Sequence, residues 1–227
     1  MLHRRDFITG GAAVMATGLT LTPNTAAAYL LATPHVLKKA NARLRGSKGI
    51  EAAMTGEIRT DGGTAPVAVG ERWRFVAALQ IEVNGPDGRK AAFDARQGVG
   101  SRATGDTALL PRKPVRLVLG ALFTQADVNG LMSLIGARLD AQHLALVGQR
   151  PCHVLGAPAG DKRANAIWVD QEDFVVRRVR FGTDAGVCEI RLDDWQGPIT
   201  DGRFPHRLTV RLAGRPVRLL TVTRVAR

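Results

Sequence analysis

The residue types that could carry covalent catalysis are few in this chain and are poorly arranged for it. Its three serines are Ser47, Ser101 and Ser133, and none stands in the Gly-x-Ser-x-Gly frame of a hydrolase nucleophile. Ser101 follows Gly98-Val99-Gly100, but the third glycine and the Lys-Ser/Thr ending of a phosphate loop are missing. We therefore expect a turn or a bulge at this position, and no nucleotide site.

Metal ligands and acid–base pairs are also unfavourably spaced. After the first 28 residues, the chain has four histidines: His35, His143, His153 and His206. No two of them are four residues apart, as on a metal-binding helix, and the consecutive Cys152 and His153 point to opposite faces of a strand. Carboxylates cluster at 170–173 and 193–194, beside predicted turns, where we interpret them as solvated caps rather than general acids or bases. We expect no catalytic residue, metal or cofactor, and hence no enzyme.

The two cysteines, Cys152 and Cys188, each lie in a strand-like segment, with two further strand-like segments between them. Strands three steps apart in a sheet are separated by about 14 Å, which is beyond the reach of a disulfide. Although an oxidising compartment would allow pairing, we expect two buried free thiols.

The first 28 residues have the pattern of a bacterial twin-arginine signal peptide. Arg4 and Arg5 are followed by Asp6 and two large apolar residues, then by an uncharged stretch from Thr9 to Thr22. Small residues at 26–28 predict cleavage after Ala28, and the stretch is too short and too rich in Gly and Thr to span a membrane. A general secretory leader with two arginines is the alternative. Either leader predicts a periplasmic protein with a single domain over 29–227.

The net charge of +12 falls to +11 when Arg4, Arg5 and Asp6 are removed with the leader. Export and the absence of a nucleic-acid-binding motif argue against nucleic acid as the partner. An anionic membrane surface is the better candidate, since each basic group near it contributes about 1 kcal/mol. The alternative is that the arginines only solvate strand faces.

A short amphipathic helix opens the mature chain. Thr33 as N-cap and Pro34 as first helical residue are start signals, and Leu37, Ala40 and Leu44 form one apolar stripe. Gly46 is expected to end this helix.

Strand patterns follow, with apolar and polar residues alternating over 50–58, 72–83 and 91–95. In the strand over 72–83, one face is expected to carry Trp73, Phe75, Ala77, Leu79, Ile81 and Val83. In the middle, the apolar run 115–123 precedes a capping box at 124–127 and a helical apolar face over 128–139, so one or two helices interrupt a β protein. Further strands are predicted near 143–148, 151–157, 164–169, 174–182, 187–195, 203–213 and 216–226. In the last of these, Val217, Leu219 and Val225 are expected to share the buried face.

Roughly ten short strands at hairpin spacing predict a mainly β (α+β) protein. We expect one large curved antiparallel sheet, or half-open β-barrel, with the helices covering its concave face. Leu, Val, Ala and Ile dominate the inward positions, and such a lining suits acyl chains; an ordinary filled core is the alternative.

Four segments carry a resemblance to a known family. The stretch 166–178 contains Trp168, Asp170 and Phe174 in the order "W-[IV]-D-x-[ED]-[TD]-[FL]-x-x-x-R", shortly after Gly156-Ala157 and Gly160-Asp161. The segments 189–195 and 202–208 fit "x-I-x-[FL]-x-[DN]-[YW]" and "G-x-x-[FY]-P-x-[RK]-[IL]". Together they resemble the bacterial outer-membrane lipoprotein-sorting (LolA/LolB-like) superfamily over most of the mature chain.

The resemblance implies about eleven antiparallel strands in a half-open barrel and a helical lid over an apolar cavity. It further implies a non-enzymatic periplasmic carrier of lipoproteins or other acyl-chain lipids, acting in outer-membrane sorting. We expect a monomer. The lid-pinning arginine of that family corresponds to Arg59, Arg72 or Arg74. We expect the lid helix to carry Leu131, Met132 and Ile135. The cavity lining is then expected from the strand residues Met54, Ile58, Trp73, Phe75, Leu79, Ile81, Phe93, Val179, Phe181, Ile190 and Leu192.

Two other functions are compatible with the same sequence. The fold could serve as a binding module that senses envelope state and docks on a membrane-bound regulator, in which case side chains would fill the cavity. An enzyme with an unrecognised site is the third possibility, because twin-arginine export often carries proteins loaded with a cofactor.

Overall fold

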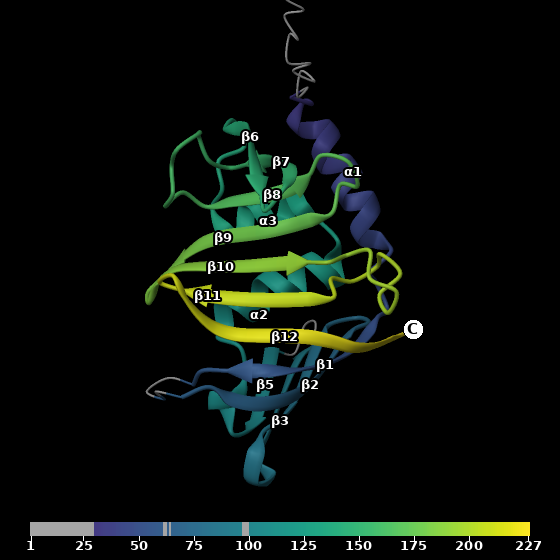
Figure 1. The fold of residues 1–227 in the computed structure, drawn as a ribbon, viewed down its shortest axis with the longest axis vertical. Coiled ribbons are helices and arrows are strands. Elements are labelled where there is room, and N and C mark those ends of the chain that lie inside the picture. Colours follow the sequence, from purple (N-terminus) through teal and green to yellow (C-terminus); the bar gives the residue numbers. More distant parts are fainter. Residues whose placement is uncertain (1–29, 61–62, 64, 97–99) are drawn as a thin grey trace, which may run out of the picture.

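The computed structural model describes residues 30–60, 63, 65–96 and 100–227, and the leader predicted over 1–28 lies outside them. The described residues form one antiparallel sheet of twelve strands (Figure 1). Their bounds are β1 Glu51–Ile58, β2 Val67–Phe75, β3 Leu79–Asn84, β4 Lys90–Arg96, β5 Gly100–Gly105, β6 Gln142–Val147, β7 Arg150–Leu155, β8 Ala166–Asp170, β9 Val176–Thr183, β10 Gly186–Asp193, β11 Arg207–Leu212 and β12 Arg215–Ala226.

Three α-helices accompany the sheet: α1 (Thr33–Arg45), α2 (Lys113–Gly120) and α3 (Val128–Ile135). A π-helical segment, Ala121–Gln125, joins α2 to α3, and short 3-10 turns occupy Pro86–Gly88 and Thr107–Leu109.

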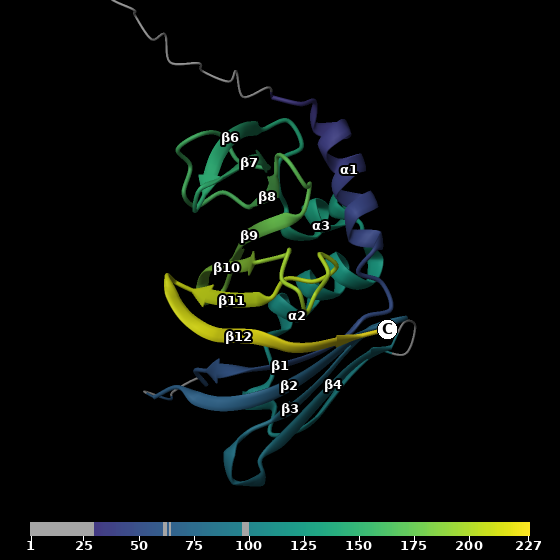
Figure 2. The ribbon, with the colours of Figure 1, turned by 45° about the vertical axis from the view of Figure 1, so that its right-hand side comes forward.

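The order of the strands explains why helices lie on the concave face. The sheet runs β5-β4-β3-β2-β1-β12-β11-β10-β9-β8-β7-β6, so β5 and β6 are its two edges although they are consecutive in the chain. The segment between them must therefore cross the sheet, and it does so as α2 and α3, while α1 flanks the upper strands (Figure 2). The predicted mainly β class, with a half-open sheet and helices on its concave side, is confirmed.

The space between the sheet and the helices holds one large apolar core. Its centre is an aromatic cluster of Phe75, Phe123, Phe204 and Trp195, with ring centroids 4.9 Å apart for Phe123–Phe204 and 5.0 Å for Phe75–Phe123. Tilted ring pairs at these distances contribute about 0.5–1.5 kcal/mol each beyond the burial of their area.

The single strand predicted over 72–83 is wrong, because the chain turns at 76–78 and makes the β2–β3 hairpin. The predicted face nevertheless survives. Phe75 pairs with Leu79 and Trp73 with Ile81, and cross-strand partners share a face. Only Ala77 leaves it, since it lies exposed in the turn.

Three further predictions need correction. Ser101 lies in strand β5 rather than in a turn, because β5 pairs with β4 over its whole length. Thr33 is not the N-cap of α1; that position is Ala32. On β12 the buried positions include Arg218, Leu220 and Val222, whereas Leu219 is 44% exposed. Arg218 lies at a buried position although it is charged. The buried face of the strand therefore cannot be identified from its apolar residues alone.

The predicted capping box at 124–127 also forms differently. Asp127 itself is the N-cap of α3 and accepts a hydrogen bond from the Asn129 amide at 3.0 Å. The Thr124 hydroxyl instead donates to the Gly120 carbonyl inside the π-helical segment. The helix predicted to 139 ends at Ile135, because Gly136 adopts the left-handed conformation (φ 65°) that closes it.

Candidate functional site

All fourteen side chains predicted to line a cavity are buried in the apolar core, and none is more than 7% exposed. They come from β1, β2, β3, β4, β9, β10 and α3, so the structure does bring them together. The aromatic cluster fills the space at their centre. Of these fourteen, Leu79, Ile81 and Phe93 line pockets at the surface of the described part of the chain.

A cleft of about 380 Å³, which we name the α2 cleft, lies between α2 and strands β3 to β5. The helix contributes Leu117 and Gly120, the π-helical segment adds Ala121, and the strands contribute Leu79 and Phe93. Leu117 is 49% exposed, so the helix presents an apolar side chain to an apolar sheet face without closing the gap between them. The remaining lining is Ala77, Ala78, Ala95, Ser101, Lys113, Arg116, Thr124 and Gln125.

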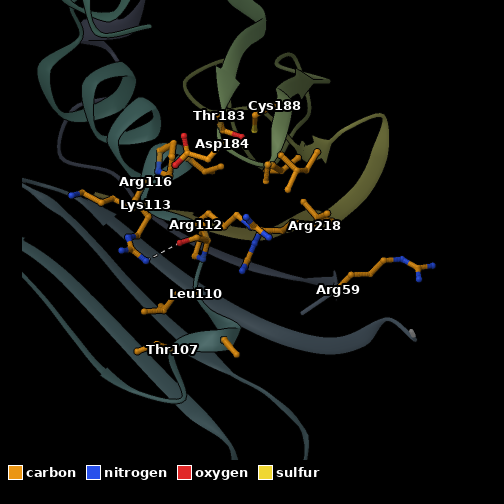
Figure 3. Close-up of a pocket in the computed structure, with 18 residues that line it drawn as sticks. Arg59, Thr107, Leu110, Arg112, Lys113, Arg116, Thr183, Asp184, Cys188 and Arg218 are labelled. Carbon is orange, nitrogen blue, oxygen red and sulfur yellow. Dashed lines mark hydrogen bonds between the residues drawn. The ribbon is translucent and has the colours of Figure 1, made fainter. Parts of the chain in front are cut away.

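A second hollow of about 290 Å³, which we name the basic pocket, opens at the first turn of α2 (Figure 3). Five basic side chains and one acidic one, Asp184, line it together with an apolar floor that includes Leu110, Val210 and Cys188. The cations come from both walls. They are Arg59 and Arg218 from the strand side and Arg112, Lys113 and Arg116 from the helix side.

Arg218 is the most deeply placed of these cations. Its guanidinium forms an ion pair with Glu71, and the two side chains are 5% and 0% exposed. Its Nη2 also donates to the Leu109 carbonyl at 2.6 Å, while Glu71 accepts from Trp73 Nε1 at 2.7 Å. Burial lowers the pKa of Arg218 to about 9, which leaves it charged at neutral pH.

Arg218 therefore ties the segment that leads into α2 to the inside of the sheet. Of the three arginines expected to pin a lid, Arg72 and Arg74 lie on the outer face, where both contact Glu51 and Glu82. The prediction is wrong for these two. Arg59 lines the basic pocket. The sequence analysis predicted no functional role for Arg112, Lys113, Arg116 or Arg218. The only signal it offered was the charge of Arg218 at a position where the strand pattern calls for an apolar residue.

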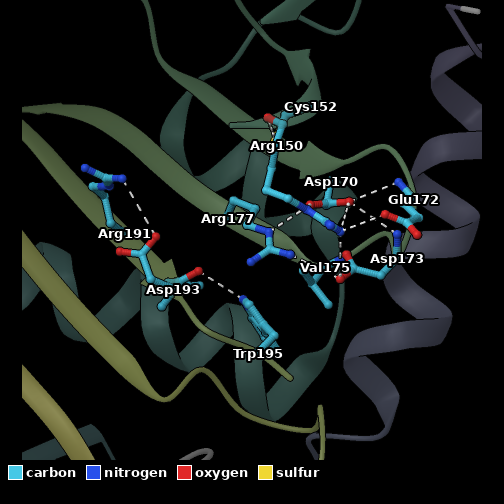
Figure 4. A network of polar contacts seen from close by, with 11 residues as sticks. Arg150, Cys152, Asp170, Glu172, Asp173, Val175, Arg177, Arg191, Asp193 and Trp195 are labelled. Carbon is cyan, nitrogen blue, oxygen red and sulfur yellow. Dashed lines mark hydrogen bonds and ion pairs between the residues drawn. The ribbon is translucent and has the colours of Figure 1, made fainter. Parts of the chain in front are cut away.

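The carboxylates at 170–173 belong to a polar network on β7, β8 and β9 (Figure 4). Asp170 is 0% exposed and accepts from Arg150 Nε and Arg177 Nε, each at 2.9 Å, and from the amides of Glu172 and Asp173. Desolvation raises the pKa of a buried carboxyl, but these hydrogen bonds and the charge of Arg177 outweigh it and lower the pKa of Asp170. The predicted cap is present, but it is buried rather than solvated, and its role is to hold the turn.

Both cysteines are buried free thiols, as predicted, on β7 and β10. Burial raises the pKa of Cys152 and of Cys188 to about 12, so neither is a nucleophile at neutral pH. Within the described ranges, no three His, Cys, Asp or Glu side chains form a group able to hold a metal ion. None of the described helices is both long and apolar enough to cross a membrane.

The chain was compared with known protein families, curated proteins and solved structures. A scan of protein-family models and a search of curated proteins both find no match. Solved structures do match. The LolA superfamily protein NE2245 from Nitrosomonas europaea has a TM-score of 0.50 at 11% identity, over 86% of this chain and 93% of that one. The fold is LolA-like.

Two further structures support the same LolA-like fold. A putative outer membrane lipoprotein-sorting protein domain from Vibrio parahaemolyticus matches with a TM-score of 0.50 at 11% identity, over 85% of this chain and 90% of that one. A DUF1329 family protein from Desulfovibrio piger matches with a TM-score of 0.51 at 12% identity, over 86% and 93%. At such identities the likeness concerns the fold and carries no site residue with it.

Proposed function

We propose that this chain is a non-enzymatic periplasmic carrier that binds the acyl chains of lipoproteins or other lipids for outer-membrane sorting. The observation that supports this most is the α2 cleft, an open apolar gap between a helix and the concave face of a half-open sheet. Ligand pockets span about 300–1,000 Å³ and are mainly apolar with a few polar groups, which describes the α2 cleft at about 380 Å³.

The α2 cleft also gives a role to the residues predicted from sequence. Leu79 and Phe93 line it directly, and Phe75 lies behind them in the aromatic cluster. The other predicted residues form the apolar core beneath, which a longer acyl chain would enter when α2 moves away from β3. The loading step is thus an exchange of one apolar contact for another, and such an exchange needs no catalytic group.

The proposal is tested with two leucines that are matched in exposure. Leu117 on α2 is 49% exposed and lines the α2 cleft, whereas Leu134 on α3 is 48% exposed and lines none of the pockets described above. Leu117→Glu is expected to weaken binding of a fluorescent fatty acid about tenfold or more, since a carboxylate there would be desolvated by the chain. Leu134→Glu is expected to bind like wild type. Equal loss in both variants, or in neither, would count against the cleft.

A second candidate function is the binding module that docks on an envelope regulator. The filled centre of the core favours it, because Phe75, Phe123 and Phe204 occupy the space that a large cargo would need. Native mass spectrometry of the chain isolated from its own periplasm separates the two. A carrier retains lipid, while a binding module retains a protein partner and no lipid.

A further inference from the structure

The basic pocket and the α2 cleft meet at one turn of helix. Lys113 and Arg116, both in the first turn of α2, line the two hollows at once. An elongated ligand in the α2 cleft would therefore place one of its ends beside a cluster of cations.

The charges around the basic pocket are not balanced within its lining. Arg218 is paired with Glu71, which lies outside the lining, and the four other basic side chains face a single acidic one. The side chain of Arg112, the N-cap residue of α2, makes no capping hydrogen bond, and no acidic residue lies in the first turn of this helix. The helix dipole therefore adds positive potential where Arg112, Lys113 and Arg116 already stand.

Arg116 carries an independent sign of a missing anionic partner. Its guanidinium lies over the Phe93 ring, 4.2 Å from the centroid, and its Nη1 donates to the Pro111 carbonyl at 2.8 Å. Its Nε is buried and makes no hydrogen bond to any described residue. A buried donor without an acceptor is costly, and beside a pocket lined with cations an anionic ligand can supply that acceptor.

We propose that the basic pocket binds the anionic head group of the lipid whose acyl chain lies in the α2 cleft. This inference rests on the proposed function and adds a substrate class to it: single-chain anionic amphiphiles, with a carboxylate or a phosphate beside Arg116 and Lys113. Arg218 is neutralised by Glu71 and closes the inner end of the pocket, whereas the more exposed Arg112 and Lys113 make the adaptable contacts.

The test compares amphiphiles that share one chain length and differ only in head group. Binding of laurate, dodecyl phosphate, monolaurin and dodecyltrimethylammonium to the full mature chain is measured by displacement of a fluorescent fatty acid. We expect the two anions to bind about tenfold tighter than monolaurin, and the cation to bind most weakly. Their relative affinity shows whether the pocket prefers phosphate or carboxylate. Inorganic phosphate alone should compete poorly, because it lacks the chain.

A matched pair of charge variants locates the effect. The double variant Arg59→Gln/Arg112→Gln changes two cations that line the basic pocket but not the α2 cleft. It should lose about five- to tenfold in affinity for the two anions while keeping that for monolaurin. The control Lys162→Gln/Arg163→Gln removes the same charge from another exposed site and should behave like wild type. Thermal melts of both variants establish that they fold.

The outcomes separate the two claims. If monolaurin binds as tightly as the anions, or if both double variants lose affinity equally, the head-group assignment is overturned while the acyl-chain site stands. If no amphiphile binds at all, the proposed function fails and this inference fails with it.

Discussion

Glu71 on β2 and Arg218 on β12 form an ion pair across the intervening strand β1, on the inside of the curved sheet. Neither side chain is more than 5% exposed, so each charge depends on the other for its solvation. The Arg218 guanidinium also reaches the Leu109 carbonyl and thereby connects the sheet to the segment that enters α2. The pair thus links the barrel wall to the helix that borders both pockets.

Removing one partner of this pair should cost more than removing both. Arg218→Met leaves Glu71 charged and buried, and we expect a loss of about 3–5 kcal/mol in the free energy of unfolding. The double variant Glu71→Leu/Arg218→Met should recover most of this loss, because it leaves no buried charge without a partner at this position. Urea denaturation of the four proteins in the cycle measures the coupling. Additive losses would mean that the two residues do not depend on each other.

The buried carboxylate of Asp170 should matter far more than its exposed neighbour. Asp170→Asn leaves Arg150 and Arg177 facing a neutral group and is expected to cost about 3 kcal/mol or more of stability. Glu172→Gln, at a side chain that is 79% exposed, should change stability by less than about 0.5 kcal/mol. Thermal unfolding followed by circular dichroism compares the two, and similar melting temperatures for both would refute the network's structural role.

His153 should make the fold sensitive to mild acid. It is 0% exposed, lies 3.4 Å from Gln142 through Nδ1, and its pKa is lowered from 6.5 by desolvation. As the pH falls, His153 is therefore protonated in the unfolded chain before it is protonated in the folded one. Stability falls as the pH drops below about 6.5, by at most about 1.4 kcal/mol per pH unit, until the folded-state pKa is reached.

The variant His153→Asn should flatten this pH dependence, as measured by urea denaturation between pH 7.5 and about pH 5. The control His206→Asn, at a partly exposed side chain, should retain it. An unchanged slope in His153→Asn would assign the acid sensitivity to other groups.

Gly120 offers a way to fill the α2 cleft without straining the fold. A Cβ at this helical position would meet only Leu79 Cβ, at 3.8 Å, which is an ordinary contact. Gly120→Leu should therefore block fatty-acid binding while raising helix stability by roughly 0.5–1 kcal/mol. Gly120→Ala shares the gain in helix propensity but adds one methyl group, so it should keep most of the binding. Full binding by the leucine variant would place the acyl chain elsewhere.

The sequence predicted the fold better than the site. Alternation of apolar residues identified the inner faces of β1, β2 and β3, and it tolerated the missed turn at 76–78 because the hairpin keeps odd positions on one face. It failed at β12, where Arg218 occupies an inward position that a pattern of apolar residues cannot reveal. It also missed β5, an exposed edge strand with little apolar content.

The site was harder to predict because it depends on contacts between distant segments. Arg112, Lys113 and Arg116 flank an apolar run and look like ordinary solvated charges until α2 crosses the sheet. Their proximity to Arg59 and Arg218 follows from β1 pairing with β12, the one neighbour relation in the sheet that is not sequential. Local periodicity contains no information about that pairing.

Photoaffinity labelling tests the central claim, acyl-chain binding in the α2 cleft, most directly. The mature chain is irradiated with a fatty acid that carries a diazirine in its chain, and the labelled residues are identified by peptide mass spectrometry. We predict labels within 77–79, 93–95 and 117–125, which excess unlabelled fatty acid suppresses. Labels confined to other surfaces, or labelling that the competitor does not reduce, would contradict the account.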